Sequence, residues 1–431
     1  MRFETAVSGT VLVALIGLGG VSVAHGTERG HTKQPGQAAA LQATRSEGEA
    51  RAAQFELVCT SIQNRFYDKN TNGVDWKHIC ETYRARLNSV KSKKEFKALV
   101  NQMLDELHAS HTSYLDDDDV EYSMLSAVIE QDLQNHKVAH IGLMGHPAGA
   151  EFVVGAVYDG GPAQKAGLLS GDRILSVDSK PFETAGSFKG KEGQTVSIQY
   201  RREGNPTIRT ATVTPVKQNV LRAFLDATSQ SARILNIGNR KIGYVHLWTM
   251  GNDAFKTTLD QLVTGKLHDT DGLILDLRDG YGGNPFGYTD VFYRPDVSWE
   301  QQYHGAQPSS RFTGYNKPMV ALINGGSRSA KEFFTYQLKK TKRATIVGTT
   351  TAGAFLGAGK VDIGQDGMLE LAIVGLRVDG KRLEGPGVSP DIEVPIAHAY
   401  TDQDTQLLRG EEILIDQIRK NAETPARVAA P

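Results

Sequence analysis

The strongest constraint on the fold comes from four short apolar runs in the second half of the chain. They lie at residues 242–245, 272–277, 319–323 and 344–347. Near-continuous apolar runs are typical of strands covered on both faces, because a half-exposed strand alternates polar and apolar residues. Helical patterns separate the runs, notably at 254–262 and 331–340. Strands that alternate with helices predict an α/β core around a mainly parallel sheet.

The region before this core, at about 138–216, has a different pattern. Short stretches of alternating polar and apolar residues are separated by glycine turns, which predicts a small β module. The candidate strands lie at 152–154, 173–177, 196–200 and 208–213. Between the first two, the sequence GGPAQKAGL at 160–168 predicts a turn followed by a short helix.

Helical spacing of apolar residues dominates the N-terminal part and the C-terminal end of the chain. The predicted amphipathic helices lie at 55–66, 74–87, 94–107 and 401–420. Four consecutive aspartates, at 116–119, follow the first three helices and are expected to form a solvated loop. The chain therefore combines a helical module, a β module and an α/β core.

The first residues have the features of an export signal. Arg2 precedes an apolar run at 11–23, and Ala24 and Gly26 supply the small residues expected at a cleavage site. The run is shorter than the roughly 20 residues that span a bilayer. We therefore expect a signal peptide over 1–26, with an uncleaved membrane anchor as the alternative. Residues 27–53 have no apolar period and are expected to form a flexible linker.

Composition and cysteine usage exclude several kinds of site. The net charge of −1 gives no indication of nucleic-acid binding or of a polybasic membrane adaptor. The two cysteines, Cys59 and Cys80, have no metal-ligand partners at suitable spacing, so a zinc site is not expected. They lie on neighbouring predicted helices. In an oxidising compartment they would form a disulfide, and two buried free thiols are the alternative.

A serine-containing loop follows the third apolar run. The sequence NGGSRSAKE, at 324–332, takes a buried strand through a glycine turn into a helix. A serine where a helix begins is exposed beside backbone N–H groups and the positive end of the helix dipole. This arrangement has the logic of a nucleophile elbow. The alternative is that Ser327 or Ser329 only caps the helix.

A second glycine-rich loop follows the second apolar run. It has the sequence LRDGYGGN, at 277–284. Glycines in such a loop let the backbone approach a ligand and present N–H donors. Because ligands of parallel sheets bind outside the carboxyl ends of the strands, we expect this loop and the Ser329 loop to meet. An ordinary turn between a strand and a helix is the alternative.

Taken together, these motifs resemble those of the tail-specific, or C-terminal processing, serine peptidases, and in catalytic details the tricorn-core branch. The matching motifs follow the family's order, at 160–174, 242–244, 277–283, 385–388 and 390–392. The resemblance covers nearly everything from Phe55 onward. It implies a helical module at 54–130, a PDZ-like domain at 138–218, a crotonase-like α/β peptidase core at 230–421 and a flexible tail at 422–431.

The resemblance also implies roles for individual residues. Ser329 aligns with the family's nucleophile. The N–H of Ala330, with an N–H from the Gly282 and Gly283 turn, would form the oxyanion hole. No metal or cofactor is implied.

The residue that activates the serine departs from the better-known branch of the family. Processing peptidases usually use a lysine after a Thr-x-Gly turn, but here that position is Ala354, and the next lysine is Lys360. The tricorn-like branch uses an early histidine oriented by a Ser and a Glu, and this chain has His111, Ser110 and Glu384 at those places. Histidine suits the role because its pKa lies near neutrality. We therefore predict His111 as general base, with Ser110 and Glu384 orienting it. A lysine base at Lys360 and a surface role for His111 are the alternatives.

The expected function is that of an exported serine endopeptidase, periplasmic or secreted, which cleaves peptide bonds through an acyl-enzyme. The PDZ-like segment would add the C-terminus of a protein or peptide substrate to a sheet edge, with Ile141, Gly142 and Leu143 around its carboxylate. A PDZ-like segment that only gates or packs is the alternative. We expect no nucleic-acid partner and no membrane span once the signal is removed, and a homo-oligomer is compatible with the sequence. A catalytically inactive peptide or lipid binder of the same fold, and a periplasmic PDZ scaffold, are the rival functions.

Overall fold

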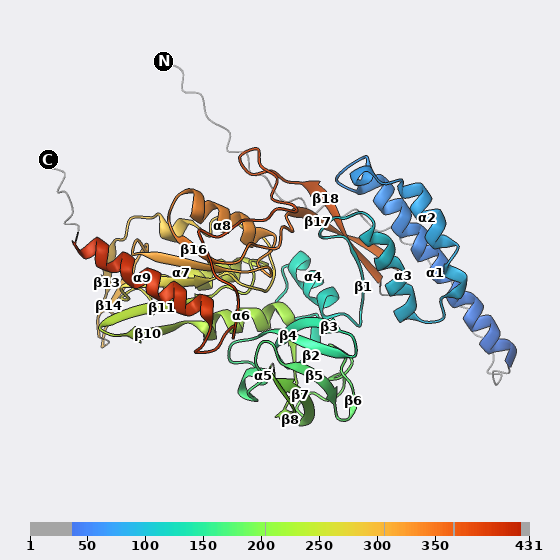
Figure 1. Ribbon diagram of the computed structural model, residues 1–431, viewed down its shortest axis with the longest axis horizontal. Coiled ribbons are helices and arrows are strands. Elements are labelled where there is room, and N and C mark those ends of the chain that lie inside the picture. Colours follow the sequence, from blue (N-terminus) through green and yellow to red (C-terminus); the bar gives the residue numbers. More distant parts are fainter. Residues whose placement is uncertain (1–36, 203, 306, 365–366, 424–431) are drawn as a thin grey trace, which may run out of the picture. The chain divides into compact units, whose positions relative to one another are not determined.

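The fold is described from a computed structural model that covers residues 37–202, 204–305, 307–364 and 367–423, with backbone only for 37–46 (Figure 1). The chain divides into two compact units. One contains the described residues up to Leu115 together with Gly357–Gly375, and the other contains Asp116–Leu356 and the described residues from Leu376 onward. The predicted signal peptide over 1–26 lies outside the described residues. No helix in the described ranges is both long enough and apolar enough to cross a bilayer.

The first unit consists of helices and a small sheet. Its helices are α1 (Gln37–Arg65), α2 (Trp76–Arg84) and α3 (Lys93–Asp105), with 3-10 turns η1 (Thr71–Gly73) and η2 (Leu87–Ser89). Strands β1 (Ser113–Asp116), β18 (Gly367–Gly375) and β17 (Leu356–Gly364) form the sheet, in that order. Short polar side chains begin two of the helices, since Asp75 accepts the His78 N–H and Ser92 accepts the Glu95 N–H. The helices bury Phe55, Ile62 and Phe96.

Two predicted boundaries of this part are wrong. Helix α1 begins at Gln37, so residues 37–53 of the predicted linker are helical. The segment is rich in Ala, Gln, Glu and Arg, which are strong helix formers even without an apolar period. The helical module predicted at 54–130 also ends too late, because α4 (Val120–Glu130) belongs to the second unit.

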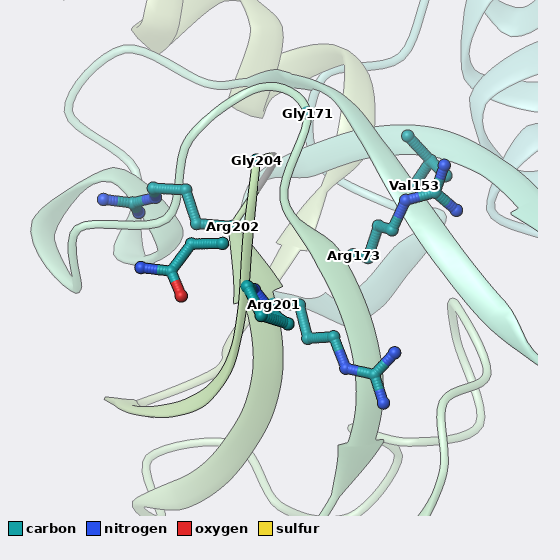
Figure 2. A pocket seen from close by; sticks show the side chains of 8 residues that line it. Val153, Gly171, Arg173, Arg201, Arg202 and Gly204 are labelled. Atoms are coloured by element: carbon teal, nitrogen blue, oxygen red, sulfur yellow. The ribbon is translucent and has the colours of Figure 1, made fainter.

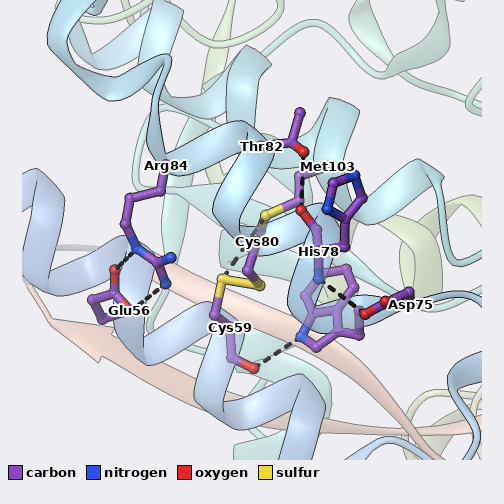
Figure 3. The surroundings of a disulfide bond; sticks show 9 residues. Glu56, Cys59, Asp75, His78, Cys80, Thr82, Arg84 and Met103 are labelled. Carbon is purple, nitrogen blue, oxygen red and sulfur yellow. Dashed lines mark hydrogen bonds and ion pairs between the residues drawn. A yellow bond between two sulfur atoms is a disulfide. The ribbon is translucent and has the colours of Figure 1, made fainter.

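A disulfide joins α1 to α2 (Figure 3). It links Cys59 to Cys80, whose Cα atoms lie 6.2 Å apart, and both side chains are buried. The Trp76 indole N–H donates to the Cys59 carbonyl at 3.0 Å, so the start of α2 is also bound to α1 by a hydrogen bond. In the chain-entropy model, closing a loop of this size stabilises the fold by about 3 kcal/mol.

The β module opens the second unit. Its strands are β2 (Lys137–His140), β3 (Leu143–Ala148), β4 (Glu151–Val157), β5 (Arg173–Val177), β6 (Lys180–Pro181), β7 (Val196–Arg202), β8 (Asn205–Val213) and β9 (Val216–Asn219), with the short helix α5 (Pro162–Lys165). The main sheet has the order β3-β4-β5-β7-β8, β6 pairs with β5, and β2 pairs with β9. The predicted strands and the predicted short helix are all present, and β7 and β8 pair as an antiparallel hairpin.

The α/β core is a six-stranded sheet. Its strands, in spatial order, are β10 (Arg233–Ile237), β11 (Arg240–His246), β12 (Gly272–Asp276), β15 (Met319–Ile323), β16 (Thr345–Gly348) and β19 (Ile392–Glu393). All neighbours are parallel except β10 and β11. A separate hairpin, β13 (Ser298–Gln301) with β14 (Ser309–Phe312), and the 3-10 turn η3 (Asp290–Phe292) lie between β12 and β15 in sequence. The predicted α/β fold class with a mainly parallel core sheet is confirmed.

Helices cover both faces of this sheet. One face packs on α6 (Val220–Ser231), α7 (Asp253–Thr264) and α8 (Ala330–Lys340) through residues such as Leu275 and Ala321. The other face packs on α9 (Thr405–Glu423), where Leu414 and Ile418 meet Ile274 and Val320. Because alternate strand residues face opposite helix layers, both faces had to be apolar. The carboxyl ends of β12 and β15 therefore support two adjacent loops, and these loops form the candidate site.

Candidate active site

The serine loop between β15 and α8 holds Ser329 in an unusual backbone conformation. Its φ of 57° and ψ of −125° lie in a region that costs a non-glycine residue about 1–3 kcal/mol. Two acceptors hold the Ser329 N–H in place, namely the Ala354 carbonyl at 2.9 Å and Glu332 Oε2 at 3.0 Å. The turn therefore presents the partly exposed Ser329 side chain at the start of α8.

The other serine of the loop has a structural role. Ser327 is fully buried, and its hydroxyl donates to the Leu277 carbonyl at 2.8 Å. The same oxygen accepts the Asn324 N–H at 3.1 Å. With both functions of its hydroxyl occupied, Ser327 joins the two loops, and Ser329 is the serine of this loop that is open to a substrate.

The glycine loop after β12 lies directly against Ser329. A Cβ atom built on Gly282 would lie 2.4 Å from the Ser329 Cβ and 2.7 Å from its Oγ, and 2.8 Å from the Ala330 nitrogen. Such distances do not occur between non-bonded atoms, so the close approach requires glycine. The Gly282 carbonyl is held by the Met250 N–H and the Thr249 hydroxyl, each at 2.8 Å. The structure thus brings together Ser329, Ala330 and Gly282, three residues that the sequence placed in one site.

Backbone donors beside Ser329 are available to an anion. Within the part of the chain that the structure describes, no hydrogen bond is formed by the N–H of Gly283 or of Ala330. The Met250 N–H donates to the Gly282 carbonyl, and the Asn284 N–H donates to the Met250 carbonyl. These two bonds fix the backbone on both sides of Gly283, whose own N–H has no acceptor among the described residues. Fixed donors next to a nucleophile are what an oxyanion hole requires.

A buried cluster of charged side chains supports the glycine loop at 277–284. Arg278 is fully buried and pairs with Asp276 at 2.6 Å and with Asp404 at 2.7 Å. Burial alone would raise the pKa of Asp276, but the Arg278 guanidinium outweighs burial and holds this pKa below its usual range. The guanidinium lies 4.7 Å over the Tyr400 ring, and the Tyr400 hydroxyl donates to the Asp279 carboxylate at 2.5 Å. The C-terminal segment thereby anchors the loop.

Glu332 is a site residue that the sequence motifs did not single out. Its buried carboxylate accepts four hydrogen bonds, from the Thr351 hydroxyl at 2.6 Å and from the N–H groups of Gly353 at 2.8 Å, Ala354 at 2.9 Å and Ser329 at 3.0 Å. Burial raises the pKa of Glu332, and these donors oppose that rise. Ser329 and Glu332 have the spacing of a capping box, and this sequence pattern could have identified Glu332 as a residue of the site. Glu332 therefore binds the 351–354 segment and the Ser329 N–H together.

The residues predicted to activate Ser329 lie in two different units. Ser110 and His111 belong to the first unit, where the Ser110 Oγ lies 2.8 Å from His111 Nδ1, so the predicted Ser–His pair is formed. Lys360, the alternative base, lies on β17 of the same unit. Glu384 belongs to the second unit, is buried, and accepts the Phe355 N–H at 2.5 Å. The identity of the base stays a prediction.

In the predicted carboxylate-binding loop of the β module, one of the expected N–H donors is already hydrogen-bonded within the protein. The Gly142 N–H donates to His140 Nδ1 at 3.0 Å, so it is already used inside the protein. Ile141 is buried and its carbonyl accepts the Ala163 N–H at 2.8 Å, while Leu143 starts β3. No sequence pattern marks His140 as a competitor for the glycine N–H. Peptide capture through Ile141, Gly142 and Leu143 stays a prediction.

We expect His140 to make the β module sensitive to acid. Burial lowers its pKa to about 4, from an ordinary value of 6.5. Between these values the unfolded chain binds more protons than the folded one, so stability falls as pH falls from 6.5 to 4. Because glutamine does not titrate, we expect His140→Gln to reduce this acid-induced loss of unfolding free energy by about 3 kcal/mol.

Urea unfolding at pH 7 and pH 4 measures this effect. His78→Gln is the matched control, because His78 is exposed. An equal acid loss in wild type and in His140→Gln would contradict the assignment.

A separate cavity of about 370 Å³ lies on the β module (Figure 2). It is lined by Val153, Gly171, Arg173, Arg201, Arg202, Gly204, Asn205 and Pro206. Its three arginines are paired within the module, two with Glu151 and one with Asp172. None of the predicted site residues lines it.

Comparisons with known proteins agree with the arrangement of the chain. Residues 241–394 match the model of peptidase family S41, residues 48–105 the tricorn protease C1 domain, and residues 129–214 the PDZ domain.

Curated relatives and a solved structure extend the match. Carboxyl-terminal-processing peptidase 2 of Arabidopsis thaliana, a chloroplast protein, is 27% identical over 78% of this chain and 67% of its own length. The carboxy-terminal-processing protease of Bartonella bacilliformis is 28% identical over 62% of this chain and 63% of its own. The chain therefore spans about two thirds of the length of these relatives. The structure of the photosystem II D1 C-terminal processing protease matches with a TM-score of 0.52 at 23% identity, over 80% of this chain and 93% of that one, and shows a shared fold.

Proposed function

We propose that this chain, which belongs to peptidase family S41 through its residues 241–394, is an exported endopeptidase that cleaves proteins through an acyl-enzyme on Ser329. The resemblance to C-terminal processing serine peptidases is confirmed at the level of the family, and the chain carries a PDZ domain. The observation that supports the mechanism best is the contact between Gly282 and Ser329, which leaves no room for a side chain.

In the proposed reaction, Ser329 Oγ attacks the carbonyl carbon of the peptide bond and its proton passes to His111. The negative charge that develops on the carbonyl oxygen is stabilised by the N–H groups of Gly283 and Ala330, assisted by the N-terminus of α8. His111 then protonates the leaving amine, and a water molecule hydrolyses the acyl-enzyme with His111 again acting as base. The hydrogen bond between Ser110 and His111 Nδ1 supports this role, because it orients the ring.

The proposed substrates are protein or peptide C-termini that bind to the PDZ domain. This proposal rests on the PDZ match and on the names of the curated relatives. The proposed export, to a periplasmic or extracellular compartment, is supported by the apolar run at 11–23. The disulfide between Cys59 and Cys80 supports this, since such bonds persist in oxidising compartments.

Hydrolysis of an unfolded protein such as reduced casein tests the proposal. Wild-type protein should release peptides, and Ser329→Ala should not. Ser309→Ala is the matched control, because Ser309 is an exposed serine on β14. Wild-type protein that binds peptides without cleaving them would favour an inactive binder of the same fold instead.

A further inference from the structure

Lys331 is a buried lysine that the proposed reaction does not use. It lies in the first turn of α8, two residues after Ser329, and its side chain is fully buried. Its ammonium group donates to the Asp279 carbonyl at 2.6 Å and lies 3.4 Å from the Arg278 carbonyl. Both carbonyls belong to the loop that leads to Gly282.

A cation at this place is unfavourable unless its contacts compensate. The N-terminus of a helix repels positive charge, and burial removes the solvation of the ammonium group. Burial lowers the pKa of Lys331 to about 7, although the Asp279 and Asp276 carboxylates favour its charged form. An apolar side chain would avoid both of these unfavourable effects. We therefore attribute the lysine at this position to its contacts with the carbonyls of the loop.

The turn that Lys331 binds has two successive left-handed residues. Asp279 has a φ of 46° and Gly280 a φ of 73°. For a residue with a side chain, such as Asp279, this conformation is unfavourable and has to be held by its surroundings. Asn324 accepts the Asp279 N–H at 3.0 Å and Tyr400 bonds its carboxylate, while Lys331 binds its carbonyl. Lys331 therefore contributes one of the three contacts that hold the residue.

We propose that Lys331 is a positioning residue that holds the 279–283 turn, and with it the Gly283 N–H, against Ser329. The proposal rests on the proposed function of Ser329. Lys331 does not act as the base in the proposed reaction, because its ammonium group is directed at the main chain of the turn. Its loss should weaken stabilisation of the transition state and leave substrate binding almost unchanged.

The test compares two lysines of the same helix. Lys331→Met keeps the apolar stem and removes the donors. Lys339→Met is the matched control, since Lys339 also donates to two carbonyls, those of Ser389 and Pro390, away from Ser329. With casein as substrate, we expect Lys331→Met to lower kcat about 10- to 100-fold with KM within about twofold, and Lys339→Met to change neither by more than about twofold.

Hydrogen exchange of the Asp279 and Tyr281 N–H groups, which are bonded to the Asn324 side chain and the Trp248 carbonyl, gives a second readout that does not depend on activity. Exchange there should be at least about tenfold faster in Lys331→Met than in wild type or Lys339→Met. If Lys331→Met does not fold, Lys331→Gln is measured in its place. Its shorter neutral side chain should give the same changes to a smaller extent.

The outcomes separate this inference from the proposed function. A wild-type protein that neither cleaves casein nor reacts at Ser329 would overturn the function, while faster exchange in Lys331→Met would still support the positioning role. Unchanged exchange in Lys331→Met would overturn that role, as would a loss of activity that appears only in KM.

Discussion

Replacement of His111 by alanine is expected to lower kcat about 1,000-fold or more, nearly as much as replacement of Ser329. Without a base the serine hydroxyl is a weak nucleophile, and residues that act as one unit give losses that do not add. The double variant should therefore be no slower than Ser329→Ala alone. Steady-state hydrolysis of casein by the three variants measures this.

The pattern of the other variants identifies the base. Lys360→Ala should retain activity close to that of wild type, and Glu384→Gln should be slowed by less than His111→Ala. An inactive Lys360→Ala beside an active His111→Ala would refute the Ser–His assignment and support a Ser–Lys peptidase.

The second large effect is expected at Gly282. Because Gly282 does not have a positive φ, alanine is compatible with its backbone, and the obstacle is the overlap of the added Cβ with Ser329 and Ala330. The added methyl group must displace either the hydroxyl or the loop. We expect Gly282→Ala to lower kcat/KM by about 100-fold or more, the size of effect seen when an oxyanion donor is lost.

Gly325→Ala is the matched control for this prediction. Gly325 lies in the serine loop, and a Cβ atom there would meet nothing within 4 Å. Thermal unfolding of both variants separates a local effect from a loss of the fold. Equal activity of Gly282→Ala and Gly325→Ala would show that the contact with Ser329 has no catalytic importance.

Much of the fold could be predicted because its signals are local. The apolar runs at 272–277 and 319–323 form β12 and β15, since strands covered on both faces are almost entirely apolar. The loops at their ends follow from the same topology, so the amino-acid sequence was enough to place Ser329 and Gly282 together.

Features that depend on distant segments could not be predicted. The β17–β18 hairpin belongs to the unit of N-terminal helices, although the residues on both sides of it belong to the other unit. Nothing in its own sequence marks that change of partner. Glu332 and Lys331 have the pattern of ordinary residues of an amphipathic helix, because their importance depends on which backbone groups the loops 277–284 and 351–354 bring to them.

Reaction with a fluorophosphonate, followed by intact-mass and peptide mapping, tests the assignment of Ser329 as nucleophile most directly. Such a probe needs both an activated serine and an oxyanion hole, so it reports the assembled site. We predict a single label on Ser329 of the folded protein, absent from Ser329→Ala and much slower to form in Gly282→Ala. Failure of the folded wild-type protein to take up label, or a label on Ser327 in place of Ser329, would contradict the assignment.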